Sequence, residues 1–83
     1  MNPRFEISVG SEYEYDDLVG NLYFDGVPVC ILTQEKGFDA MEVQFLPAPS
    51  GGRWQFSLKD FEEALAALKR RMWELRRVEP NGS

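Results

Sequence analysis

Hydrophobic and polar residues alternate along the first half of the chain, whereas the second half carries apolar residues at helical spacing. Alternation with a period of two is typical of half-buried strands, and it predicts strands at residues 5–9, 18–24, 27–33 and 41–45. Asp25-Gly26 separates the second strand from the third, and this dipeptide is a strong signal for a two-residue hairpin turn. The first half is therefore expected to fold as an antiparallel β-meander.

The hairpin at Asp25-Gly26 also predicts which side chains share a face. A regular two-residue turn pairs Leu22 with Val29, and the core face then carries Leu18, Leu22, Phe24, Val27, Val29 and Ile31. The opposite face carries Val19, Tyr23, Cys30 and Leu32, an apolar patch that we expect to support self-association, as in a homodimer. Two alternatives stay open, namely that a loop covers this patch or that the register is shifted by one residue, which would exchange the faces.

Pro28 interrupts the third predicted strand. Proline has no N–H to donate, so this part of the strand is expected to lie at a sheet edge or beside a bulge.

The second half of the chain predicts one long helix over residues 57–77. Ser57 is the expected N-cap, Asp60 completes a short capping box, and Phe56 and Phe61 have the spacing of a hydrophobic staple. The expected apolar stripe consists of Phe61, Leu65, Leu68, Met72 and Leu75. We therefore predict an α+β fold, a four-stranded antiparallel β-meander with one C-terminal helix packed on one face.

The length of 83 residues allows one small domain. We expect a single domain at residues 1–79, with the sheet at 4–46, a Pro/Gly-rich loop at 47–53 and the helix at 57–77. Residues 80–83 are expected to form a disordered tail.

The composition argues against most catalytic classes. The chain has a net charge of −5, no histidine and one cysteine, which excludes intrachain disulfides, Cys/His zinc sites and His-dependent nucleophilic dyads. We therefore expect a protein that is not an enzyme and that needs no cofactor or metal. Its negative charge disfavours direct binding to nucleic acid or to a membrane. The first residues lack the pattern of a signal peptide, and a cytoplasmic location is expected.

Six consecutive residues form a second candidate binding feature. They combine four carboxylates with two tyrosines and are Glu12, Tyr13, Glu14, Tyr15, Asp16 and Asp17. Carboxylates attract Arg and Lys of a partner, and tyrosines serve as rigid anchors, so we expect a protein partner with a basic surface here. Mimicry of a phosphate backbone is a related interpretation, and a plain solvated loop is the alternative. The spacing of a calcium loop is absent.

Arg53 and Trp54 follow a Gly-Gly pair and are further candidate contacts, because Arg and Trp are enriched at binding hot spots. The alternative is that the tryptophans seal the edge of a small core.

Residues 15–19, 21–26 and 31–37, followed by the alternating strand 41–45, resemble a scattered set of small uncharacterised bacterial proteins. The resemblance implies this fold and a prokaryotic or mobile-element origin, and it implies no catalytic residues. In size, acidity and lack of catalytic groups the chain is also similar in kind to anti-CRISPR proteins and toxin immunity proteins. We therefore expect a non-enzymatic acidic inhibitor that blocks a basic surface of an effector complex. The alternatives are a toxin immunity protein or a structural homodimerising module.

Overall fold

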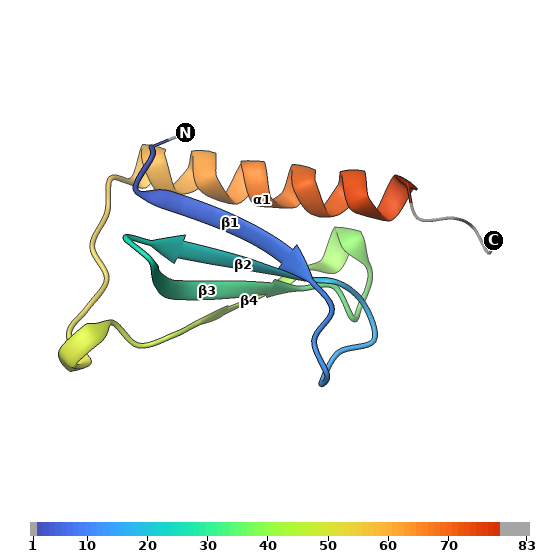
Figure 1. Cartoon of the computed structure of the whole chain (residues 1–83), viewed down its shortest axis with the longest axis horizontal. Coiled ribbons are helices and arrows are strands. Elements are labelled where there is room, and N and C mark those ends of the chain that lie inside the picture. Colours follow the sequence, from blue (N-terminus) through green and yellow to red (C-terminus); the bar gives the residue numbers. More distant parts are fainter. Residues whose placement is uncertain (1, 79–83) are drawn as a thin grey trace.

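Four strands form one antiparallel sheet with the order β1-β2-β3-β4, and a long helix lies across one of its faces (Figure 1). The computed structural model describes residues 2–78, which contain strands β1 (Phe5–Gly10), β2 (Val19–Phe24), β3 (Val27–Thr33) and β4 (Glu42–Phe45), followed by helix α1 (Leu58–Val78). Two short 3-10 helices, η1 (Phe38–Ala40) and η2 (Pro49–Gly51), lie in the connections. The predicted α+β meander with a C-terminal helix is confirmed. The predicted tail at 80–83 lies outside the described residues.

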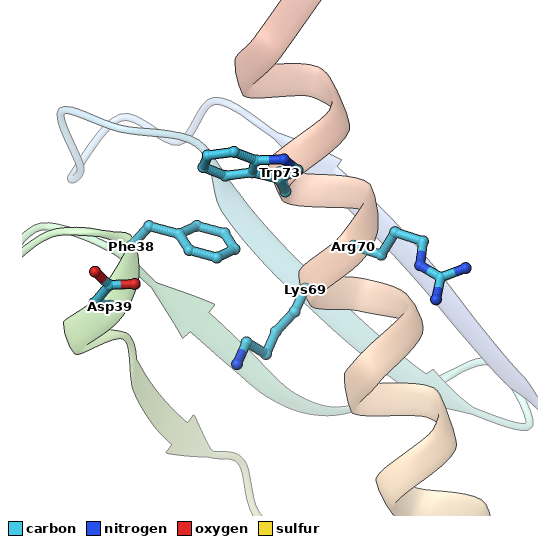
Figure 2. A pocket seen from close by; sticks show the side chains of 5 residues that line it. All are labelled: Phe38, Asp39, Lys69, Arg70 and Trp73. Atoms are coloured by element: carbon cyan, nitrogen blue, oxygen red, sulfur yellow. The ribbon is translucent and has the colours of Figure 1, made fainter.

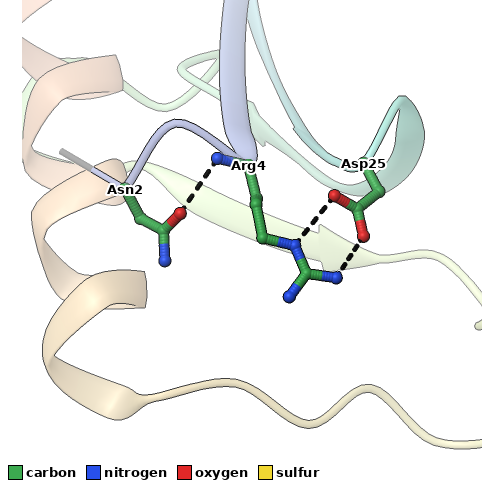
Figure 3. A network of polar contacts seen from close by, with 3 residues as sticks. All are labelled: Asn2, Arg4 and Asp25. Carbon is green, nitrogen blue, oxygen red and sulfur yellow. Dashed lines mark hydrogen bonds and ion pairs between the residues drawn. The ribbon is translucent and has the colours of Figure 1, made fainter.

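The β2–β3 hairpin turns at Asp25-Gly26, as expected. Both residues have positive φ, 54° and 80°, which is the signature of a type I′ turn. Arg4 holds the turn from the start of β1, because its guanidinium donates two hydrogen bonds to the Asp25 carboxylate (Figure 3). The Arg4 backbone N–H donates to Asn2 Oδ1 at 2.9 Å. These contacts join the N-terminal segment to the hairpin.

The predicted register of this hairpin is correct only next to the turn. Tyr23 pairs with Pro28 as expected, but the register shifts between Leu22 and Tyr23, so that Leu22 pairs with Cys30 instead of Val29. The shift is a β-bulge beside Pro28, one of the two arrangements predicted for this proline. Beyond the bulge the predicted faces of β3 are therefore exchanged.

Helix α1 begins with the predicted cap. The backbone N–H of Asp60 donates to Ser57 Oγ at 3.3 Å, and the rings of Phe56 and Phe61 stack with centroids 5.7 Å apart. The Asp60 carboxylate accepts a hydrogen bond from Asn2 Nδ2 at 3.0 Å, which links the helix start to the N-terminal segment. The predicted N-cap and hydrophobic staple are thus confirmed.

The core lies between α1 and the strands β1 and β2. Ala64, Leu68 and Met72 are fully buried, whereas Phe61 and Leu65 are only half-buried. The buried face of α1 is thus centred on Ala64, Leu68 and Met72. It is rotated about the helix axis relative to the predicted stripe, so that Phe61 and Leu65 lie at its margin. As a result, α1 covers the β1–β2 side of the sheet and leaves β4 largely uncovered.

The opposite face of the sheet is partly covered by residues 11–18, which run beneath it at the end where β3 stops (Figure 1). Tyr15 of this segment contacts Gln44 of β4, and Gln34 Nε2 donates to the Leu18 carbonyl at 3.0 Å. Val19 points away from α1 and is nevertheless fully buried. A loop thus covers one end of the face that was predicted to be open.

Candidate functional site

The acidic loop, defined here as residues 11–17, projects from the face of the sheet that lies opposite α1. All four of its carboxylates, those of Glu12, Glu14, Asp16 and Asp17, are exposed. Tyr13 is fully exposed and stands among them, whereas Tyr15 is half-buried. The structure therefore places one aromatic side chain within a cluster of solvent-facing charges.

Hydrogen bonds at its base hold the acidic loop in place. The Glu35 carboxylate accepts hydrogen bonds from the backbone N–H groups of Asp16 and Asp17 at 3.1 and 3.0 Å. Gln44 Nε2 donates to the Tyr15 hydroxyl at 3.3 Å, so the loop reaches across the sheet to β4. Because the end of the loop that leads into β2 is held by Glu35 and Gln44, Tyr15, Asp16 and Asp17 keep a defined position relative to the sheet.

The negative charge of this region extends beyond the loop. Glu35 is exposed beside it, and Glu42 is exposed at the start of β4. Lys36 Nζ lies 2.8 Å from Glu42 Oε2, and this hydrogen bond raises the pKa of the Lys36 ammonium. Surface ion pairs of this kind contribute little to stability. We call the exposed carboxylates of Glu35 and Glu42, which follow β3 and begin β4, the acidic margin.

Arg53 and Trp54 do not join the acidic loop. The indole Nε1 of Trp54 donates to the Leu46 carbonyl at 2.9 Å, and its ring stacks on Phe56 with centroids 5.4 Å apart. This places Trp54 near the β2–β3 turn, at the other end of the sheet from the acidic loop (Figure 1). Arg53 is exposed. The predicted partner-binding residues therefore fall into two separate groups.

The four residues predicted for self-association do not form an exposed patch. Val19 and Cys30 are fully buried, Leu32 is 6 % exposed and Tyr23 is half-buried. The bulge beside Pro28 turns Cys30 and Leu32 onto the core face, and the acidic loop lies over the end that holds Val19. Burial also raises the pKa of the Cys30 thiol to about 11, so this thiol is protonated at neutral pH.

An exposed apolar strip lies elsewhere, along β4. Val43 pairs with Leu32 and Phe45 with Cys30, so both side chains are on the helix side of the sheet. Because α1 packs over β1 and β2, Val43 is 44 % exposed and Phe45 is 61 % exposed. We call the surface formed by this strip and the helix residues that face it, Phe61, Leu65, Lys69 and Trp73, the edge groove.

The helix wall of the edge groove is a ridge of residues spaced four apart, Phe61, Leu65, Lys69 and Trp73. Phe61 lies 6.3 Å from Phe45 between ring centroids, and Trp73 lies 5.1 Å from Phe38 of η1. A surface pocket opens at the Trp73 end and is lined by Phe38, Asp39, Lys69, Arg70 and Trp73 (Figure 2). The groove is thus apolar at its centre and cationic along part of the helix.

Sequence reasoning missed the edge groove. The alternation of Val43 and Phe45 with polar residues predicts an ordinary half-buried strand, one face of which would be covered by the helix. The ridge Phe61–Leu65–Lys69–Trp73 was available in the sequence as an i, i+4 series. Which of the four strands lies beneath the helix is a tertiary property that the sequence pattern does not contain.

Among residues 2–78, no helix is long and apolar enough to cross a membrane. Within the same residues, no three His, Cys, Asp or Glu side chains are grouped so that they could hold a metal ion. No protein-family model, curated protein or solved structure matches this chain.

Proposed function

We propose that this chain is a non-enzymatic protein-binding domain that uses the acidic loop to engage a basic surface on a partner protein. The observation that carries the proposal is the fully exposed Tyr13, which stands among four exposed carboxylates on a loop held by other elements. Exposed aromatic side chains are typical anchors of protein interfaces, and fixed charges speed the encounter with an oppositely charged surface.

The position of the loop supports this function in a second way. Its base is bound to Glu35 and Gln44, so fewer degrees of freedom remain to be lost when a partner binds. The inhibitor of an effector complex and the toxin immunity protein expected from the sequence are two forms of the same function. Both remain predictions, and they differ in whether the basic partner surface binds nucleic acid or belongs to a toxin's active site.

The test compares the wild type with a loop variant that carries Glu12→Gln, Glu14→Gln, Asp16→Asn and Asp17→Asn. A matched control neutralises four exposed acids elsewhere, at Glu6, Glu62, Glu63 and Glu74, and so has the same net charge. Each tagged protein is used to capture partners from a bacterial lysate at low and at high salt, with identification by mass spectrometry.

We expect the wild type and the control to retain the same basic proteins at low salt and to lose them at high salt, whereas the loop variant retains few of them at either. The captured partner then shows whether its basic surface is a nucleic-acid groove or a toxin active site. If the loop variant and the control lose these partners equally, net charge rather than the acidic loop governs binding and the proposal is wrong.

A further inference from the structure

We propose that the free edge of β4 binds an extended segment of the partner protein as a fifth strand, and that this segment alternates apolar with basic residues. The inference rests on the proposed function, because the basic residues of the segment would face the acidic loop. It adds the form of the partner's contact surface and a second binding surface, the edge groove.

The backbone of β4 is arranged to accept a strand. The Leu46 N–H donates to the Val29 carbonyl at 2.8 Å, and Gln44 pairs with Ile31. Because hydrogen-bonded and non-hydrogen-bonded pairs alternate in an antiparallel ladder, the N–H and C=O groups of Val43 and Phe45 point away from β3. Strand edges are commonly protected by proline, lysine or a bulge, and residues 42–45 contain none of these.

On the side of the sheet that faces α1, the edge of β4 favours apolar side chains in an added strand. A strand added beside β4 would place every second side chain next to Val43 and Phe45, which are 44 % and 61 % exposed. The half-buried Leu65 lies on the ridge of α1 that faces the same groove. Apolar side chains at these positions would be removed from water on both sides, by the strand and by the helix.

On the side of the sheet opposite α1, the same edge favours basic side chains in an added strand. Gln44 and Glu42 point to that side, and Gln44 is hydrogen-bonded to Tyr15 of the acidic loop. The intervening side chains of an added strand would therefore lie beside Glu42, which is paired with Lys36, and on the side of the sheet that the acidic loop occupies. Lysine or arginine is the residue type that these charges stabilise.

Charge disfavours a second copy of this chain as the occupant. Pairing β4 with itself would bring two acidic loops to the same side of one joined sheet, and each chain has a net charge of −5. A segment that alternates apolar and basic residues would contact both the apolar groove and the acidic margin favourably. A second copy of this chain would gain only the apolar contact.

The test uses a blocked heptapeptide of alternating valine and lysine, together with a peptide of the same composition in which the valines and lysines are segregated. Binding to the whole chain is followed by isothermal titration and by amide hydrogen exchange at Val43 and Phe45. We expect the alternating peptide to bind about tenfold more tightly than the segregated one and to slow exchange at both amides. Equal affinity, or unchanged exchange at these two amides, contradicts strand addition.

Two variants test the site itself. Val43→Pro removes an N–H that points away from β3, so the β3–β4 ladder is kept while the edge is blocked. Phe45→Glu keeps the backbone but places a charge in the groove. Ala66→Glu is the matched control, because Ala66 is exposed on α1, about half a helical turn from the buried Leu68, and is not one of the ridge residues of the groove. We expect both groove variants, checked for folding by circular dichroism, to lose the preference for the alternating peptide while the control keeps it.

The remaining outcomes separate this inference from the proposed function. If both Val/Lys peptides bind equally and lose affinity with the four-acid loop variant, the acidic loop binds basic partners but strand addition is wrong. If an alternating valine/glutamate peptide binds as tightly as the valine/lysine peptide, the basic pattern is wrong. If the chain without peptide is a dimer that Phe45→Glu converts to monomer, a second copy occupies the edge and the inference is overturned.

Discussion

Gly20 is a residue at which the helix lies directly against the sheet. A Cβ atom at this position would lie 2.6 Å from Met72 Sδ and 2.9 Å from Leu68 Cδ1, and both of those side chains are fully buried. The absence of a side chain at Gly20 thus allows α1 to settle over β2. The position of α1 in turn leaves β4 uncovered and creates the edge groove.

We therefore expect Gly20→Ala to destabilise the fold by about 1–3 kcal/mol, because the neighbouring side chains have little room to move. Gly10→Ala is the control, since a Cβ at Gly10 would meet no atom within 4 Å. Urea unfolding measures both changes. The double variant with Met72→Ala should cost less than the sum of the single variants, and simple additivity would show that the contact with Met72 is not the cause.

The β2–β3 hairpin shows how an element combines local and distant contacts. Its type I′ turn follows from Asp25-Gly26 alone, but the Asp25 carboxylate is also bound by Arg4, which precedes β1. Arg4 lies over the Phe24 ring as well, with its Cζ 4.5 Å from the centroid. The turn is therefore coupled electrostatically to the N-terminal segment.

The hairpin predicts a dependence of stability on acid pH. The hydrogen bond from Arg4 lowers the pKa of Asp25 below 3.8, so its stabilising contribution is present above that pH and is lost as the pH falls through the lowered pKa. Asp25→Asn keeps a residue that tolerates positive φ and removes the charge. We expect the wild type to lose more stability than Asp25→Asn when urea midpoints at pH 6 and pH 3 are compared.

Asp39→Asn, which removes an exposed acid of η1, is the control for this measurement and should keep the wild-type pH response. Identical acid responses of the wild type and Asp25→Asn would show that the pair with Arg4 contributes nothing measurable in solution.

The bulge in the same hairpin explains why the predicted faces were wrong. A regular ladder from the turn pairs Leu22 with Val29, and one extra residue beside Pro28 moves the partner to Cys30. Since side chains alternate with a period of two, this single step exchanges the faces of the rest of β3. Pro28 signalled a bulge or an edge, but only the packing of α1 on the sheet selected the bulge.

The molecule as a whole is asymmetric in how its sheet is covered. Helix α1 lies over β1 and β2 on one face, and the acidic loop lies over one end of the other face. The edge at β4 borders both the exposed apolar groove and the acidic margin. Both proposed binding surfaces therefore meet at one strand, although their residues are far apart in the sequence.

This arrangement predicts that Leu32 and Tyr23, both candidates for self-association from the sequence, differ in how much their substitution destabilises the fold. Leu32→Asp should destabilise the fold by about 3 kcal/mol or more, because it places a charge in the core. Tyr23→Asp should cost less, since Tyr23 is only half-buried. Thermal unfolding by circular dichroism at two protein concentrations is the measurement. A folded Leu32→Asp monomer derived from a dimeric wild type would restore the original self-association hypothesis.

The sequence by itself determined the local features of this protein. Alternation predicted the four strands, Asp25-Gly26 the hairpin turn, and Ser57 with the Phe56–Phe61 pair the start of the helix, because each depends on residues close together in the chain. Tertiary structure alone decided the register beyond the bulge, the burial of Cys30 and Leu32, and the exposure of Val43 and Phe45. These features depend on where α1 sits on the sheet, and that position is set by contacts between residues distant in sequence, such as Gly20 with Met72.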